Sequence, residues 1–196
     1  MDRRKVLLTG MAAAGSAIAA PALAQPDYES REDRRRTYTR DEVVRAGSDF
    51  LGVTAEAVAA AVERVARDNG SEPSAYIAGE EGSGAIVAGL RYGQGLLYLP
   101  GREPTEVFWR GPSIGWDWGG NASRVFTLCY NLHEADMIFR RYPGVEGSAY
   151  LVGGLGVNYQ KADDITLAPI RAGLGLRLGA NVGYLAYSRK RKMFPF

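Results

Sequence analysis

Residues 173–179 read GLGLRLG, and this stretch decides the class of fold that we expect. Leucine occupies every second position, and glycine or arginine occupies the positions between. Strict alternation predicts a β-strand, in which successive side chains point to opposite faces. A strand with three glycines on one face either bends sharply or lets another backbone come very close, which a small, tightly curved barrel needs.

Before residue 75 the chain has helical signals instead. Residues 39–42 (TRDE) have the T-x-x-E spacing of a capping box, which predicts the start of a helix. A second helix is expected from Thr54 to the stop signal Asn69-Gly70. The residues expected on the buried faces of the two helices are Val43, Gly47, Phe50 and Leu51, then Val58, Ala61, Val62 and Val65.

From residue 75 onward the apolar residues recur with a period of two. We expect strands at 75–78, 85–91, 95–99, 106–110, 113–118, 124–131, 148–152, 155–159, 166–178 and 181–187, and a short helix at 132–141. Many short strands joined by glycine-rich turns indicate a barrel or a sandwich. The 25 glycines, close to twice the usual share, fit this interpretation because they lie inside apolar runs.

The first 24 residues are typical of an export signal. A charged start with the pair Arg3-Arg4 precedes a moderately apolar stretch, and residues 22–24 (ALA) form a cleavage site after Ala24. The apolar stretch contains glycine, serine and threonine, which favours the twin-arginine route over the general secretory route. We therefore predict an exported protein with a signal at 1–24, a flexible basic lead-in at 25–37 and a single domain at 38–196.

Charge and cysteine content exclude several classes of protein. Of the 24 basic and 22 acidic residues, the signal removes three basic residues and one acidic residue, which leaves 21 of each. A neutral, exported chain does not point to nucleic acid. The single Cys129 lies in an apolar run and is expected to be a small buried hydrophobe. With one cysteine and one histidine, we expect no metal and no cofactor.

Several motifs in order make the chain resemble a known family. They are residues 75–81 (AYIAGEE), 89–95 (GLRYGQG), 109–117 (WRGPSIGWD), 130–132 (YNL), 144–148 (GVEGS) and 169–184 (PIRAGLGLRLGANVGY). Together they are similar to the envelope integrity protein A family of alphaproteobacteria. The resemblance implies a periplasmic protein that maintains the cell envelope, without an established enzymatic activity. It also implies a small SH3-like, partly open β-barrel with the N-terminal helices packed against it.

Aromatic residues and arginines suggest where such a protein would bind. A domain of this size rarely buries three tryptophans fully, so we expect one or two of them to line a groove with arginines nearby. The candidate ligand-binding residues are Tyr92, Trp109, Arg110, Trp116, Asp117, Trp118, Arg171 and Arg177. The expected ligand is an envelope lipid, a glycan or a periplasmic protein.

Catalysis has little support in the sequence. The only histidine, His133, stands at the expected start of a short helix, and no serine has the setting of a nucleophile elbow. Asp117, between Trp116 and Trp118, is expected to pair with Arg91, Arg110, Arg171 or Arg177. The weaker alternative is a glycan hydrolase that uses Asp117 or Glu81 as its acid.

The last residues combine four cations with an apolar tip. We expect this tail to be solvated, and the alternative is that its cations contact anionic phospholipid head groups. The cations are Arg189, Lys190, Arg191 and Lys192. We therefore expect a non-enzymatic protein that binds an envelope component. Direct lipid binding or transfer is the alternative, and a hydrolase is the second alternative.

Overall fold

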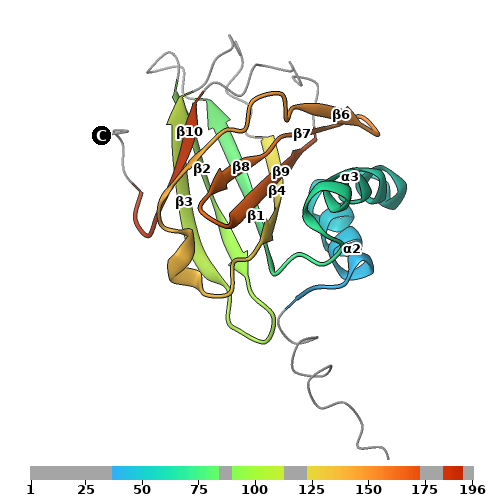
Figure 1. Cartoon of the computed structure of the whole chain (residues 1–196), viewed down its shortest axis with the longest axis horizontal. Helices are drawn as coiled ribbons and strands as arrows, with labels where there is room; N and C mark the ends of the chain where they lie inside the picture. Colours follow the sequence, from blue (N-terminus) through green and yellow to red (C-terminus); the bar gives the residue numbers. More distant parts are fainter. Residues whose placement is uncertain (1–36, 84–89, 113–122, 173–182, 192–196) are drawn as a thin grey trace, which may run out of the picture.

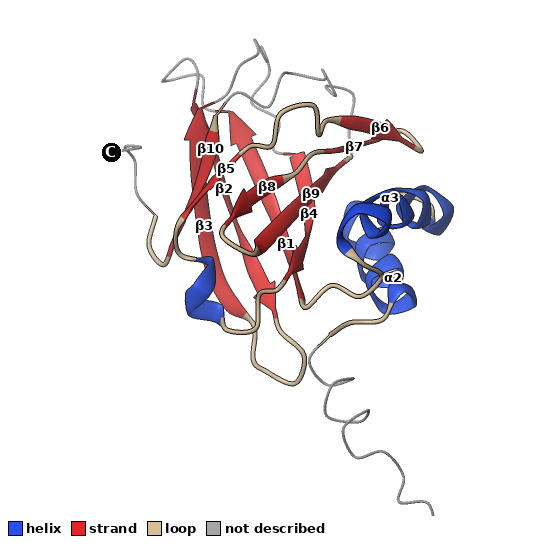
Figure 2. Cartoon of the chain, viewed as in Figure 1, coloured by secondary structure: helices blue, strands red, loops and turns tan. Residues whose placement is uncertain are grey.

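The computed structural model describes residues 37–83, 90–112, 123–172 and 183–191 (Figure 1). The predicted signal, the lead-in and the glycine-rich stretch 173–179 lie outside the described residues. Within them, a curled antiparallel sheet forms the body of the protein, and two helices cover one side of it (Figure 2).

Both helices begin where the sequence predicts, and the second also ends there. Helix α2 (Arg40–Leu51) has the full capping box of Thr39 and Glu42, and it ends at Gly52 with a φ of 69°. Helix α3 (Ala55–Asn69) begins after Thr54, whose side chain accepts a hydrogen bond from the Ala57 amide, and ends at Gly70. Each helix buries one face, which confirms the predicted apolar stripes except for Phe50, which is only partly buried.

Ten strands form one sheet in the described part of the chain. Their order is β5-β10-β3-β2-β1-β4-β9-β7-β6, and β8 pairs with β9. The strands are β1 (Ala75–Ser83), β2 (Leu90–Tyr98), β3 (Thr105–Pro112), β4 (Ser123–Tyr130), β5 (Arg141–Pro143), β6 (Tyr150–Val152), β7 (Leu155–Val157), β8 (Gln160–Ala162), β9 (Ile165–Arg171) and β10 (Tyr184–Ser188).

The sheet curls until its two sides meet. The residue after β5, Gly144, forms an isolated antiparallel bridge with Gln160 of β8. The Val145 amide donates to the Tyr159 carbonyl at 3.0 Å, which strengthens this closure. The mainly β, barrel-like architecture with N-terminal helices confirms the expected fold class.

Alternation along the strands divides the apolar residues between two cores. Inside the barrel lie Ile77, Leu97, Val107, Cys129, Leu167 and Tyr187. Between the barrel wall and the helices lie Val43, Val62, Val65, Phe126, Leu128 and Ile170. Cys129 is buried in the inner core, and burial raises the pKa of its thiol, which confirms its expected role as a small hydrophobe.

Three predicted elements were wrong in extent. The two strands expected at 85–91 and 95–99 are one strand within the described residues, because β2 continues through Gly93 and Gly95. The helix expected at 132–141 is reduced to the 3₁₀ helix η1 (Ala135–Ile138). The chain then enters β5, where Tyr142 points into the barrel and contacts Tyr187 edge-on.

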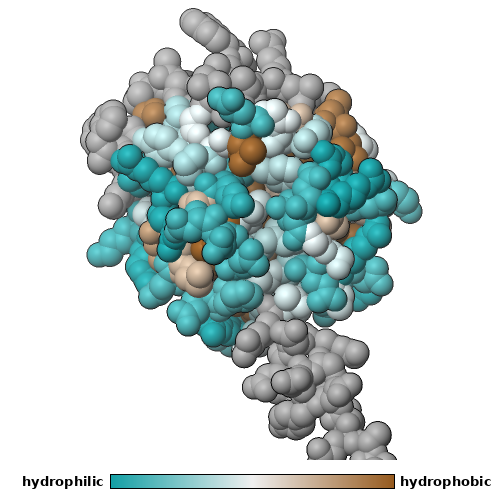
Figure 3. Space-filling model, in the orientation of Figure 1, coloured by the Kyte–Doolittle hydropathy of each residue, from teal (hydrophilic) through white to brown (hydrophobic). Residues whose placement is uncertain are grey.

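The surface of the described part is mostly hydrophilic on the face shown in Figure 3. The large hydrophobic side chains that it exposes are Leu96, Val145 and Leu151. Among the described residues, no helix has both the length and the apolar character needed to cross a membrane.

The joint between helices and barrel should depend on Phe126. Its fully buried ring lies in the outer core, so Phe126→Ala should lower the free energy of unfolding by about 3–5 kcal/mol. Urea denaturation measures the change. Leu96→Ala, at an exposed position of β2, is the control and should change it by less than about 1 kcal/mol. Equal losses in the two variants would contradict the assignment of this core.

Candidate functional site

Charged side chains gather inside one end of the barrel, which we call the barrel mouth. The mouth is the end at which β1 and β9 finish and β2 begins, at the top of Figure 1. Glu81 of β1, Arg91 of β2 and Arg171 of β9 occupy inward-facing positions there, beyond the apolar layers of the inner core. The barrel therefore has a packed interior and an ionic end.

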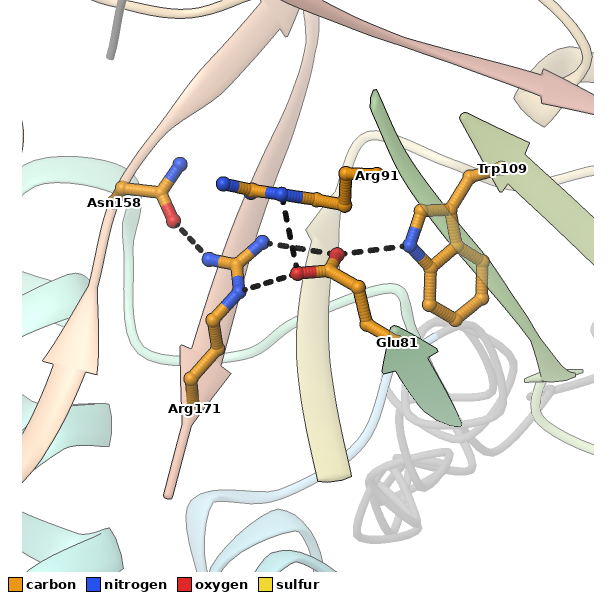
Figure 4. A network of polar contacts seen from close by, with 5 residues as sticks. All are labelled: Glu81, Arg91, Trp109, Asn158 and Arg171. Carbon is orange, nitrogen blue, oxygen red and sulfur yellow. Dashed lines mark hydrogen bonds and ion pairs between the residues drawn. The ribbon is translucent and has the colours of Figure 1, made fainter. Parts of the chain in front are cut away.

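Glu81 is the centre of this cluster, as Figure 4 shows. Its carboxylate accepts two hydrogen bonds from Arg171, from Nε at 3.1 Å and from Nη2 at 3.3 Å. Arg91 Nε lies 3.3 Å from Glu81 Oε1, and Trp109 Nε1 donates to Oε2 at 3.0 Å. Because Glu81 is only 8% exposed, these partners replace the water that a carboxylate needs.

Glycines let Trp109 reach the carboxylate. A Cβ atom at Gly93 would lie 2.1 Å from Trp109 Cε2, and a Cβ atom at Gly79 would lie 2.6 Å from Trp109 Cη2. Both distances are far below van der Waals contact. The indole therefore lies against bare backbone of β1 and β2, with its N–H directed at Glu81.

The arginines decide the protonation state of Glu81. Burial alone would raise the pKa of its carboxyl group, but Arg171 and Arg91, with hydrogen bonds from Arg171 and Trp109, outweigh burial and lower that pKa. Burial lowers the pKa of the Arg91 guanidinium, and Glu81 opposes this effect. Since an arginine stays charged in proteins, the cluster holds two positive charges and one negative charge.

The two arginines differ in how fully they are engaged. Arg171 donates to Glu81 twice and to the Asn158 side-chain oxygen, so three of its nitrogens have partners. Among the described residues, Arg91 forms one ion pair, with Glu81. Its side chain is 28% exposed, against 16% for Arg171. Arg171 therefore positions the carboxylate, and Arg91 is the more exposed cation of the two.

The structure brings together only some of the predicted site residues. Trp109, Arg171 and Glu81 meet at the mouth, although Trp109 is buried in the inner core rather than exposed in a groove. Tyr92 and Arg110 face the outside of the barrel, in register with each other on β2 and β3. Trp116, Asp117, Trp118 and Arg177 lie outside the described residues.

Asn158 was missed by the sequence analysis. It is a buried amide that follows the buried strand β7 and precedes Tyr159. A polar residue in an apolar run needs a hydrogen-bond partner when it is buried, and this was the available signal. The partner, Arg171, is 13 residues away in the sequence.

His133 and the described cations of the C-terminal tail lie away from the mouth cluster. His133 is exposed, and no group of three metal-ligating side chains occurs in the described ranges. In the C-terminal tail, Arg189 forms an ion pair with Asp136 and lies over the Phe139 ring, at 4.4 Å from its centroid. Lys190 and Arg191 are exposed, and Lys192 is outside the described residues.

Removing the Glu81 charge should destabilise the protein strongly. Glu81→Gln would leave Arg91 and Arg171 without their countercharge, so the free energy of unfolding should fall by about 3–5 kcal/mol at neutral pH. Because the folded pKa is lowered, this contribution is complete above about pH 4.5 and disappears as the pH falls further.

Urea denaturation from neutral to acid pH measures both effects. The wild type should lose stability below about pH 4.5, while Glu81→Gln should lose less over the same range. The control is Glu80→Gln, at the exposed neighbouring position. A Glu81→Gln variant as stable as Glu80→Gln would contradict the role of the carboxylate.

Gly93 should not accept a side chain. Gly93→Ala would force the Trp109 ring away from Glu81, and the free energy of unfolding should fall by about 1–3 kcal/mol. Gly82→Ala is the matched control, because a Cβ atom there would meet nothing within 4 Å. The indole N–H resonance of Trp109 should move in the first variant only.

Comparison with known proteins agrees with this architecture. A crystal structure of a β-barrel-like, uncharacterized protein from Brucella abortus is 48% identical, with a TM-score of 0.75. The match covers 82% of this chain and 99% of that one. A search of curated proteins found no match.

A family model described as envelope integrity protein A matches residues 36–196, which include all the described elements. The chain therefore belongs to the envelope integrity protein A family.

Proposed function

We propose that this protein supports the cell envelope by binding a singly charged anionic group, a carboxylate or a phosphodiester, at the barrel mouth. The family suggests a role in envelope integrity and a location in the envelope. The observation that carries the proposal is the charge of the cluster: two arginines share one carboxylate, so one positive charge has no counterpart among the described residues.

Arg91 is the group that would contact the ligand. Its guanidinium has one ionic contact and remains partly exposed, so nitrogens are available for an incoming anion. Arg171 is held by Glu81 and Asn158, and it would fix the position of the cluster while the ligand binds. Ligand binding would complete an ion cluster that is already ordered.

The packed interior favours recognition of a charged group over burial of an acyl chain. Directly beneath the mouth, Trp109, Ile77 and Leu97 belong to the buried inner core. An acyl chain would have to displace these side chains. We therefore place direct lipid transfer second to head-group or glycan binding.

The chemistry of Glu81 suits a structural role better than a hydrolytic one. A general acid in a glycosidase needs a raised pKa, whereas the arginines lower the pKa of Glu81. All of its hydrogen bonds hold the ionised form in place. The proposal is therefore a binding function without catalysis, in the periplasm, after export and cleavage behind Ala24.

Arg91→Gln should weaken ligand binding, and with it the function, while leaving the fold intact. Titration of the mature protein with acetate and with dimethyl phosphate should shift the Trp109 indole N–H resonance. The affinity of Arg91→Gln should be lower by about 10- to 100-fold, since a charged hydrogen bond contributes about 1.5–3 kcal/mol. In a deletion strain, this variant should fail to restore resistance to detergent.

Arg102→Gln is the control, because Arg102 is exposed in the turn between β2 and β3. It should bind both probes and restore resistance. Thermal unfolding of both variants checks that each is folded. Full restoration by Arg91→Gln, or binding that it does not weaken, would contradict the proposal.

A further inference from the structure

We propose that Arg110 and Arg141 form a second anion site, on the outer face of the barrel, and that it takes a phosphate monoester. Trp109, the neighbour of Arg110 in β3, points into the barrel, so Arg110 points outward. The sheet therefore separates this site from the barrel mouth. Nothing in the following argument depends on the function proposed for the mouth.

Strand register places the two arginines in one row. Arg110 of β3 is opposite Ala186 of β10, and Ala186 is opposite Arg141 of β5. Because neighbouring strands are about 4.8 Å apart, the two arginine backbones are about 10 Å apart. Two long side chains at that spacing can meet over the methyl group of Ala186. We call these residues the outer arginine pair.

Arg110 is the unusual member of the pair. The residue is only 8% exposed, yet its buried Nε has no hydrogen-bond partner. Neither arginine of the pair forms an ion pair within the described part of the chain. A buried guanidinium N–H without an acceptor is unfavourable, so the unpartnered Nε points to a missing anionic partner.

Arg141 provides the accessible side of the site. It is exposed, and its guanidinium lies over the Tyr184 ring, 4.9 Å from the ring centroid. This cation–π contact holds the side chain over the outer face and leaves its N–H groups directed sideways. A ligand can therefore reach Arg141 first and Arg110 at the base of the site.

The charge of the pair selects the class of ligand. Glu106, the acid on the same face of β3, is four residues from Arg110, or about 13 Å along the strand. Within the described residues, the pair therefore carries two positive charges that no carboxylate neutralises. A phosphate monoester has a charge of about −1.5 to −2 at neutral pH and three acceptor oxygens. It matches two guanidiniums better than a carboxylate or a diester does.

Two small probes test this assignment on the full mature protein. Methyl phosphate is a monoester, and dimethyl phosphate is a diester with one charge. At neutral pH, methyl phosphate should shift the backbone amide resonances of Tyr184 and Ala186 and bind about tenfold more tightly there than dimethyl phosphate. Its advantage should shrink below about pH 6, where the monoester loses its second charge.

Arg141→Gln is the decisive variant, because an exposed side chain can be replaced without unfolding the protein. It should weaken methyl phosphate binding about tenfold and leave the Trp109 indole response to acetate unchanged. Arg91→Gln should do the reverse. Arg102→Gln should change neither response. Methyl phosphate binding reports on the outer site, and the Trp109 response to acetate reports on the mouth. The two proposals can therefore fail separately.

Three results would overturn the proposal. They are the absence of shifts at Tyr184 and Ala186, equal affinity for the two probes, and unchanged methyl phosphate binding in Arg141→Gln. If Arg110 instead pairs with an acid of this chain such as Asp117, methyl phosphate should cause no shifts at Tyr184 and Ala186. If binding is confirmed, co-sedimentation with vesicles containing phosphatidic acid, lost in Arg141→Gln, would identify a lipid head group as the source. Binding of methyl phosphate without co-sedimentation would identify a soluble phosphate monoester.

Discussion

The rest of the barrel is arranged around the buried carboxylate of Glu81. A carboxylate in this position is tolerated only if charged and polar donors surround it. The donors come from β2, β3 and β9, so the pairing of Glu81 constrains three other strands of the sheet. Asn158 extends the same network to the segment between β7 and β8, beside the point where the barrel closes.

This constraint explains why the barrel interior is apolar away from the mouth and ionic at the mouth. Away from the mouth, Ile77, Leu97 and Leu167 pack as an ordinary apolar core. At the mouth, Trp109 forms the boundary, because its ring belongs to the apolar layer and its N–H belongs to the ionic one. Gly79 and Gly93 supply the space for that ring. The glycines on the inner face of this sheet therefore serve packing as well as curvature.

Local signals predicted the helical part well. The capping box at Thr39, the cap at Thr54 and the stop at Asn69-Gly70 involve residues within a few positions of one another, and the structure confirms each. The same kind of signal misled at Gly93. A glycine between two strand-like runs looks like a turn, but here it makes room for the ring of Trp109, which is distant in sequence. Likewise, the expected helix stops short of Arg141, and the chain enters β5, where the barrel interior accepts the Tyr142 ring.

The sequence by itself determined the two helices, the mainly β barrel-like class and the family, and it named Trp109 and Arg171 as candidates. Only the tertiary structure decided that Glu81 joins them, that Asn158 holds Arg171, and that Trp109 and Arg110 serve opposite faces. The physical reason is distance along the chain. Helix caps and alternation depend on neighbouring residues, whereas Arg171 meets Glu81 across 90 positions. Such a contact depends on strand register, which forms only when the whole sheet closes.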